Sequence, residues 1–206
     1  MRMSNSSWRL RHPHIVRVLD FAVEQGTPVL IMEYAPQGTL QERYPPGTRL
    51  PLATMVDFVV QVASALQYAH NHQVIHRDVK PGNILLDADQ RLLISDFGLS
   101  LLSPSPDLLS TQEPAGTFPY TAPEQLRGKP CFASDQYALG IIAYEWLCGK
   151  RPFEGNAWQI MHQHLSMTPP PLRDFCPTLP AAVETVILRA FCEYAGIRTG
   201  PGTGQP

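Results

Sequence analysis

The chain has 206 residues, of which 44% are apolar and 17% charged, a composition typical of a globular protein and not of a disordered one. Sixteen basic against eighteen acidic residues give a net charge of −2, which provides no general electrostatic attraction for nucleic acid or an anionic membrane. We therefore expect a globular protein that binds no nucleic acid, with length for one large domain or two small ones.

The opening of the chain is predicted to form strands. Residues 15–23 (IVRVLDFAV) and 28–34 (PVLIMEY) are rich in Val, Ile, Leu and aromatic residues and are separated by a short turn, so we expect a β-hairpin. A polar stretch, APQGTLQERYPPGTRLP, follows as a connector. Apolar residues then recur at steps of three and four, which predicts an amphipathic helix over about 53–71.

The rest of the chain is predicted to be mainly helical after a second hairpin, NILLDADQRLLIS. Residues 100–121 hold many Ser, Thr and Pro and form a long loop, which in a compact domain is either functional or disordered. SDQYALGIIAYEWLCG is apolar on almost all sides, as a deeply buried helix would be. Two further helices are expected at 156–166 and 180–192.

The segment VIHRDVKPGNILL (74–86) places a carboxylate, a cation and an amide within six positions: Asp78, Lys80 and Asn83. Taken singly, Asp78 reads as a turn residue and Asn83 as a cap at the start of a strand. Three further strings follow in order, namely SDFG, GTFPYTAPE and SDQYALG. Each of these strings is weak by itself, but their order and spacing together are specific.

Together these motifs resemble a protein kinase, specifically a bacterial-type serine/threonine kinase truncated at its amino end. The resemblance runs from LRHPHIVRVLDF to about residue 190. It implies an α+β, protein-kinase-like fold with a mainly helical large lobe and a remnant β-hairpin of the small lobe. The implied domains are a small-lobe remnant over 1–35, a large lobe over 36–192 and a flexible tail over 193–206.

The resemblance implies an enzyme that transfers the γ-phosphate of ATP to Ser and Thr hydroxyls of protein substrates, with ATP and Mg²⁺ as cofactors. In such an enzyme Asp78 accepts the proton of the substrate hydroxyl and Lys80 neutralises the transferring phosphate. Asn83 and Asp96 hold Mg²⁺, a hard cation that prefers oxygen ligands. Lys80 two residues after Asp78, together with Thr117 after Gly116, resembles serine/threonine rather than tyrosine specificity.

The same resemblance implies a place for the nucleotide. Met32 aligns with the gatekeeper position, and Leu85 would lie against the adenine ring. Glu33 and Ala35 fall where the backbone of the family's hinge hydrogen-bonds adenine. For Met32 and Leu85 an ordinary place in the apolar core is an equally good interpretation.

Regulatory residues also follow from the resemblance. Arg77 precedes the catalytic Asp, and in similar kinases this arginine binds a phosphate on the activation loop. Thr111 is the expected phosphorylation site, with Ser110 beside it, because a phosphate there could form charge-assisted hydrogen bonds to Arg77. A merely solvated loop threonine is the alternative.

A last group of residues has an expected structural role. Asp96, Phe97 and Gly98 form the family's metal-binding turn, with Phe97 in the regulatory hydrophobic spine; the alternative is an ordinary turn with a buried Phe. Asp135 is expected to hydrogen-bond the backbone near Arg77. Glu124 is expected to pair with Arg198.

The sequence also departs from the kinase pattern. No G-x-G-x-x-G loop stands before HPHIV, and Lys80 is the first lysine, so the small-lobe lysine that pairs with a helix glutamate is missing. We therefore expect impaired activity from this chain. The alternative to an enzyme is a non-catalytic, kinase-derived interaction module or a gene fragment, with a misassigned start or a frameshift near residue 191 as possible origins.

The remaining features concern the compartment. No apolar run reaches the roughly eighteen residues that span a bilayer, and no signal peptide opens the chain. Four widely spaced cysteines without a C-x-x-C pair are expected to be reduced. These features predict a cytoplasmic protein without a membrane segment and leave its oligomeric state open. His70, His72 and His76 lack a partner ligand at suitable spacing, so no metal cluster is predicted.

Overall fold

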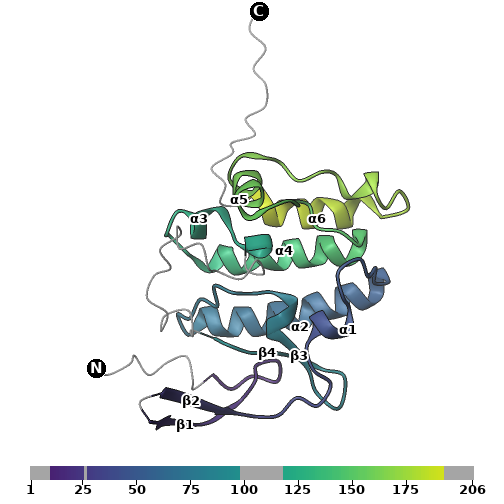
Figure 1. The fold of residues 1–206 in the computed structure, drawn as a ribbon. Helices are drawn as coiled ribbons and strands as arrows, with labels where there is room; N and C mark the ends of the chain where they lie inside the picture. The colour runs from purple at the N-terminus through teal and green to yellow at the C-terminus, as the bar shows by residue number, and fades with distance from the viewer. Residues whose placement is uncertain (1–9, 26, 98–117, 193–206) are drawn as a thin grey trace, which may run out of the picture.

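The computed structural model describes residues 10–25, 27–97 and 118–192. These residues form a stack of layers, which Figure 1 shows edge-on. A β-hairpin lies at one end of the stack, a second small sheet comes next, and the long helices follow above it. The strand-rich opening and the mainly helical body expected from the sequence are both present.

Both predicted hairpins are confirmed. β1 (Val18–Glu24) pairs with β2 (Thr27–Met32) in an antiparallel register, and β3 (Ile84–Leu86) pairs with β4 (Leu92–Ile94) in the same way. The two sheets are separate, but the segment before β1 is tied to β4. The N–H of Val16 donates to the C=O of Ile94 at 2.9 Å, and the N–H of Ile94 donates to the C=O of His14 at 3.0 Å.

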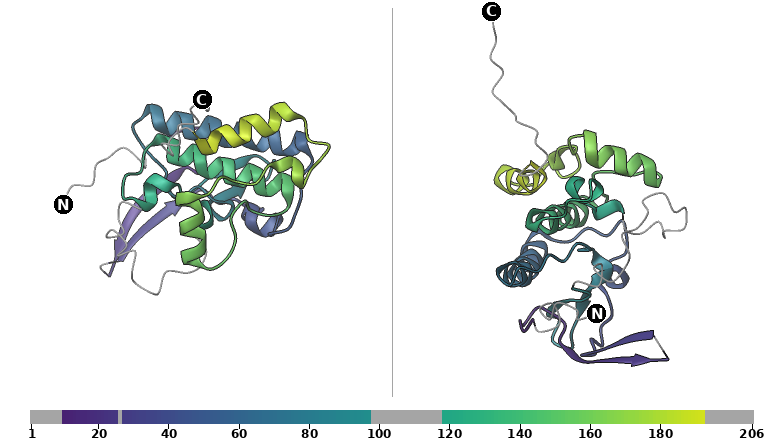
Figure 2. Two further views of the ribbon diagram at one scale, coloured as in Figure 1. Left: turned by 90° about the horizontal axis from the view of Figure 1, so that it is seen from above. Right: turned by 90° about the vertical axis from the view of Figure 1, so that its left-hand side faces the viewer.

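Three long helices form the body of the protein. α2 (Leu52–Asn71), α4 (Phe132–Cys148) and α6 (Ala181–Cys192) lie one above another, and Figure 2 shows them end-on in its right panel. α4 is in the middle layer and packs against α2 and α6, which explains why its sequence is apolar on nearly all sides. At Gly140 a Cβ atom would lie 2.9 Å from the Cβ of Ala190, so this glycine permits the close approach of α4 and α6.

Shorter helical elements complete the fold. α5 (Ala157–Ser166) matches the helix expected at 156–166, and α3 (Pro123–Leu126) is a single turn. α1 (Leu40–Arg43) lies within the stretch that the sequence assigned to a polar connector. It forms because Thr39 and Glu42 make a capping box, in which each side chain accepts a hydrogen bond from the other residue's backbone N–H.

Helix α2 bears on the expected absence of a membrane segment. By length and composition alone it could cross a membrane, contrary to the expectation that no apolar stretch is long enough. Core helices of globular proteins meet the same criterion. In this fold Val62, Ala65 and Leu66 of α2 are buried in the main apolar core together with α4, which gives its apolar face a structural role.

Candidate active site

The loop between α2 and β3 carries the polar residues that the sequence singled out. Asp135, near the start of α4, anchors it and is only 1% exposed. Its carboxylate accepts hydrogen bonds from the backbone N–H groups of His76 (2.9 Å) and Arg77 (2.8 Å) and contacts Nε2 of His70 at 2.7 Å. The bond to Arg77 is the one that the resemblance implied. The anchor holds Arg77 at φ +72°, a left-handed conformation that side chains rarely adopt.

His76 fixes the loop from the inside. Its ring is fully buried, and Nδ1 accepts from the N–H of Asp78 at 3.2 Å while Nε2 lies 2.8 Å from the C=O of Ser95. These partners assign the proton to Nε2. The ring also packs against Phe97 with the centroids 4.5 Å apart. One buried imidazole therefore ties the loop to the segment that carries Asp96.

The candidate catalytic residues meet around Asp78. Nζ of Lys80 lies 2.7 Å from Oδ2 of Asp78, and Nδ2 of Asn83 donates to the same oxygen at 2.9 Å and to the Asp78 C=O at 2.8 Å. Ser95 connects this group to Asp96, because its N–H donates to the C=O of Asn83 at 2.9 Å and its hydroxyl donates to Oδ2 of Asp96 at 3.0 Å. A base, a cation and two oxygen ligands are thus gathered in one network.

The two expected metal ligands suit magnesium. The Asn83 amide nitrogen donates to Asp78, which leaves its Oδ1 free of these two bonds as an oxygen donor. The Ser95 hydroxyl links the Asn83 C=O to the Asp96 carboxylate. Mg²⁺ is bound by one or two carboxylates together with substrate phosphates and water, so this donor set fits it. No cluster of three or more His, Cys, Asp or Glu side chains suited to a metal occurs in the described ranges, and such a closed cage is not what Mg²⁺ requires.

The residues expected around adenine also lie together. Met32, Ala35 and Leu85 pack with Val16 and Leu93 in a small apolar cluster that is separate from the main core. The N–H of Glu33 donates to the C=O of Arg17 at 2.9 Å. Within the described part of the chain, no backbone hydrogen bond is made by the Glu33 C=O or the Ala35 N–H, and these are groups of the kind that bind an adenine edge.

Several predicted residues cannot be placed. Thr117, Thr111, Ser110, Gly98 and Arg198 all lie outside the described residues, so their roles remain predictions.

Arg77 and Glu124, the expected partners of a phosphate on Thr111 and of Arg198, do lie in the described part of the chain. Nε of Arg77 is buried and lacks a hydrogen-bond partner among the described residues. Glu124 is buried, and its Oε1 accepts hydrogen bonds from the Ser134 hydroxyl at 2.6 Å and the Cys131 thiol at 3.8 Å. Its carboxylate is therefore satisfied in part without Arg198.

Sequence reasoning missed several residues that shape the site. His70 and Ser95 join the network described above, and Nε2 of Gln125 donates to the C=O of Arg77 at 2.6 Å. Tyr120 donates its hydroxyl hydrogen to Oε2 of Glu145 at 2.6 Å. His70, Tyr120 and Gln125 each have a partner that is distant in sequence, so no local pattern marks them, although Tyr120 stands inside a quoted motif. Ser95 also stands inside a quoted motif, but a single serine beside Asp96 does not indicate a hydrogen bond.

A loop that gathers a base, a cation and oxygen ligands in this way is typical of a phosphotransferase. The sequence matches the family described as protein kinase domain over residues 4–182, and the chain belongs to that family. The predicted resemblance and fold class are thereby confirmed.

Curated relatives are bacterial serine/threonine-protein kinases. PrkC of Bacillus subtilis is 36% identical over 191 residues, which cover 92% of this chain and 30% of PrkC. PknF of Mycobacterium tuberculosis is 38% identical over 204 residues, covering 93% of this chain and 42% of PknF. PkaA of Streptomyces coelicolor is 40% identical over 190 residues, covering 89% and 34%. The chain thus spans less than half the length of these relatives.

Proposed function

We propose that this chain is a cytoplasmic serine/threonine protein kinase domain that transfers the γ-phosphate of ATP to Ser or Thr hydroxyls of protein substrates. The observation that carries the proposal is the network in which Asp78, Lys80 and Asn83 are in direct contact and Asp96 is attached through Ser95. The bacterial relatives named serine/threonine-protein kinases support it.

Each residue of the network has a chemical part in this reaction. Phosphoryl transfer passes through a highly charged transition state, so catalysis is mainly positioning and charge neutralisation. Asp78 takes the proton of the attacking hydroxyl, and Lys80, within 2.7 Å of Asp78, brings a positive charge to the transferring phosphate. Asn83 and Asp96 would hold Mg²⁺, which would neutralise phosphate charge. Asp135 and His76 act indirectly, because they fix the backbone on which Asp78 stands.

A second candidate function is a non-catalytic interaction module. The observation in its favour is that Lys80 is the first lysine of the sequence, whereas active kinases use a lysine on a small-lobe strand, paired with a helix glutamate, to hold the α- and β-phosphates. The contacts among Asp78, Lys80 and Asn83 favour the enzyme, and the nucleotide affinity of these 206 residues decides how much they can do by themselves.

Regulation by phosphorylation is part of the proposal. The buried Nε of Arg77, without a described partner, is a hydrogen-bond donor that a phosphate could satisfy. We propose Thr111 as the residue that carries this phosphate, with Ser110 as its neighbour. Mass spectrometry of the kinase after incubation with ATP and a restored amino-terminal segment tests this: phosphate found only outside residues 100–117 contradicts it.

Titration calorimetry tests the nucleotide part of the proposal on the chain itself. We expect ATP with Mg²⁺ to bind these 206 residues no tighter than high micromolar concentrations, because they include no G-x-G-x-x-G loop before HPHIV and no lysine before Lys80. Asp96→Ala is expected to abolish the Mg²⁺ dependence of this binding, whereas Asp89→Ala, which changes an exposed carboxylate in the β3–β4 turn, is expected to preserve it. Submicromolar affinity, or Mg²⁺ dependence that survives Asp96→Ala, contradicts the assignment.

A further inference from the structure

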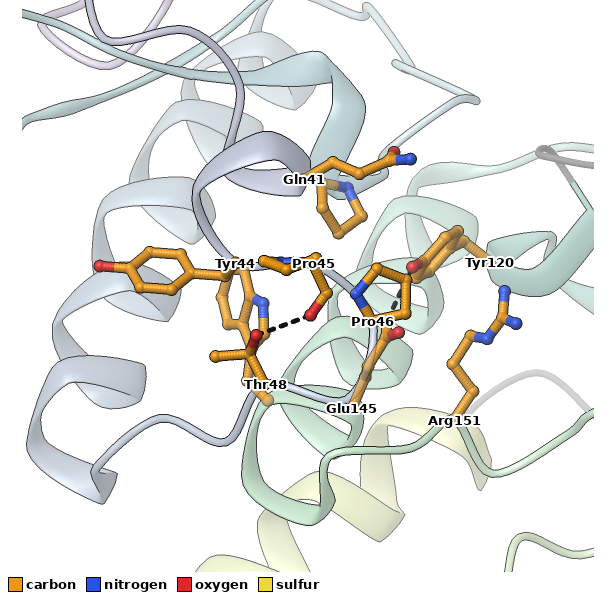
Figure 3. A pocket seen from close by; sticks show the side chains of 10 residues that line it. Gln41, Tyr44, Pro45, Pro46, Thr48, Tyr120, Glu145 and Arg151 are labelled. Atoms are coloured by element: carbon orange, nitrogen blue, oxygen red, sulfur yellow. Dashed lines mark hydrogen bonds between the residues drawn. The ribbon is translucent and has the colours of Figure 1, made fainter.

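A pocket of about 90 Å³ opens beside the candidate catalytic loop. Figure 3 shows its walls: Tyr44, Pro45 and Pro46 on one side, and Tyr120, Glu145 and Arg151 on the other. Pro81 also lines it, and this residue follows Asp78 by three positions in the sequence. A peptide with its hydroxyl at Asp78 could therefore place a neighbouring side chain in the pocket, since each extended residue spans about 3.3 Å.

The carboxylate of this pocket is already engaged. Glu145 is buried, and its Oε2 accepts the hydrogen bond from the Tyr120 hydroxyl at 2.6 Å. Burial raises the pKa of the Glu145 carboxyl, and the Tyr120 hydrogen bond and the charge of Arg151 oppose this rise. Desolvation and the nearby Glu145 raise the pKa of the Tyr120 hydroxyl, so Tyr120 remains a neutral donor. Glu145 is thus poorly placed to receive a cation from outside.

The cation of this pocket is not engaged by a carboxylate. Arg151 is partly exposed, its side chain hydrogen-bonds the Tyr120 hydroxyl, and none of the ion pairs found among the described residues includes it. In Figure 3 its guanidinium stands beside Tyr120 at the edge of the pocket. Guanidinium groups offer five N–H donors in a planar fork that suits a carboxylate.

We propose that this pocket accepts an acidic side chain, Asp or Glu, of the protein substrate and that Arg151 determines this specificity. The proposal rests on the proposed function, because it places the peptide by its hydroxyl at Asp78. The proline and tyrosine rings of the opposite wall provide an apolar surface for the methylene groups of the ligand, while Arg151 pairs with its carboxylate. A basic side chain would meet the positive charge of Arg151 before it reached the buried Glu145.

Peptide binding without nucleotide tests this proposal on the chain as it exists. Fluorescent peptides with one serine among Ala and Gly carry a single Glu at successive flanking positions, and matched peptides carry Gln or Lys there. We expect one position at which the Glu peptide binds roughly five- to tenfold tighter than the Gln peptide, an effect typical of a partly exposed charge-assisted pair. Fluorescence anisotropy measures the affinities.

Arg151→Gln is expected to remove this preference, and Arg151→Glu is expected to transfer it to the Lys peptide. Arg173→Gln is the matched control, because it removes the same charge from an exposed residue that does not line the pocket and is expected to leave the preference unchanged. Thermal melts verify that each variant is folded.

A preference that survives Arg151→Gln, a preference for Lys in the parent chain, equal binding of all peptides, or no saturable binding at all overturns the proposal. Because no ATP is present, failed phosphoryl transfer leaves this result unchanged. An overturned preference, in turn, leaves the proposed kinase function standing.

Discussion

The two hairpins of this chain have similar sequences and different surroundings. In the β3–β4 hairpin, Ile84, Leu86, Leu92 and Ile94 are each at most 1% exposed, whereas in the β1–β2 hairpin Leu19, Val23 and Ile31 are 56%, 61% and 44% exposed. Local β-propensity accounts for both hairpins, but only the β3–β4 hairpin is enclosed by the helices. Burial therefore decides which hairpin can support a site.

The candidate catalytic and metal-binding residues lie around the buried β3–β4 hairpin. Asn83 and Asp96 flank the buried hairpin, and Asp78 stands on the loop that leads into it. The exposed hairpin ends at Met32, and Met32 and Ala35 pack in the small apolar cluster with Leu85. The proposed residues for proton transfer and charge neutralisation thus lie in or next to the buried hairpin, whereas Met32 lies at the end of the exposed one.

The largest expected effect is at the anchor of the buried region. Asp135→Ala is expected to destabilise the fold by about 3–5 kcal/mol, because it removes the carboxylate that satisfies two backbone N–H groups and His70. Denaturant unfolding measures this loss. Asp57→Ala, which removes an exposed carboxylate on α2, is expected to change stability by less than about 0.5 kcal/mol. Equal effects for both variants would contradict the anchor role.

A pair of variants compares the hairpins directly. Ile94→Ala is expected to cost about 2–5 kcal/mol, because it leaves a cavity at a fully buried position. Leu19→Ala removes an exposed side chain from β1 and is expected to stay within about 0.5 kcal/mol. Chemical denaturation measures the loss of unfolding free energy in each variant. A cost at Leu19 that approaches the cost at Ile94 would mean that the exposed hairpin is covered by something in solution.

Glu145→Gln is expected to give a smaller effect that depends on pH. Burial raises the folded-state pKa of Glu145 above its value of 4.5 in the unfolded chain. The stability contributed by the protonated carboxyl is therefore present below pH 4.5 and is lost as the pH rises through the folded pKa. Gln has no proton to lose, so Glu145→Gln gains stability relative to the parent between pH 4 and pH 7.

Thermal melts across that range test this prediction. Glu24→Gln, at an exposed strand position, serves as the control for the loss of one negative charge. The prediction is contradicted if the difference in melting temperature between Glu145→Gln and the parent stays constant with pH after the Glu24→Gln difference is subtracted.

Much of this fold could be predicted from the sequence because its elements are strongly periodic. The helix expected at 53–71 is α2, and the buried helix around SDQYALGIIAYEWLCG is α4. The positions of Asp78, Asn83 and Asp96 also followed from local motifs, which fix spacing along the chain. α1 was missed although Thr39 and Glu42 have capping-box spacing, because a four-residue helix shows no periodicity.

Contacts between distant residues could not be predicted in the same way. The Tyr120–Glu145 hydrogen bond joins residues 25 positions apart, and the His76–Ser95 contact joins residues 19 positions apart. Such pairs depend on how α4 and β4 are placed in three dimensions, and a single polar residue in a motif does not indicate its partner. The resemblance to the kinase family predicted the hydrogen bond between Asp135 and the Arg77 backbone, but it did not predict the contact between Asp135 and His70.

A fusion protein shows whether the loop between α2 and β3 holds a working phosphoryl-transfer site. An amino-terminal segment that carries the glycine-rich loop and strand lysine of active protein kinases is fused ahead of residue 10. Transfer of labelled phosphate from ATP to a serine peptide is then measured for the fusion and for its Asp78→Asn variant. We predict that the fusion transfers phosphate and that Asp78→Asn lowers the rate at least a hundredfold, a barrier increase of about 2.7 kcal/mol. A variant that retains most of the activity of the fusion would contradict the account.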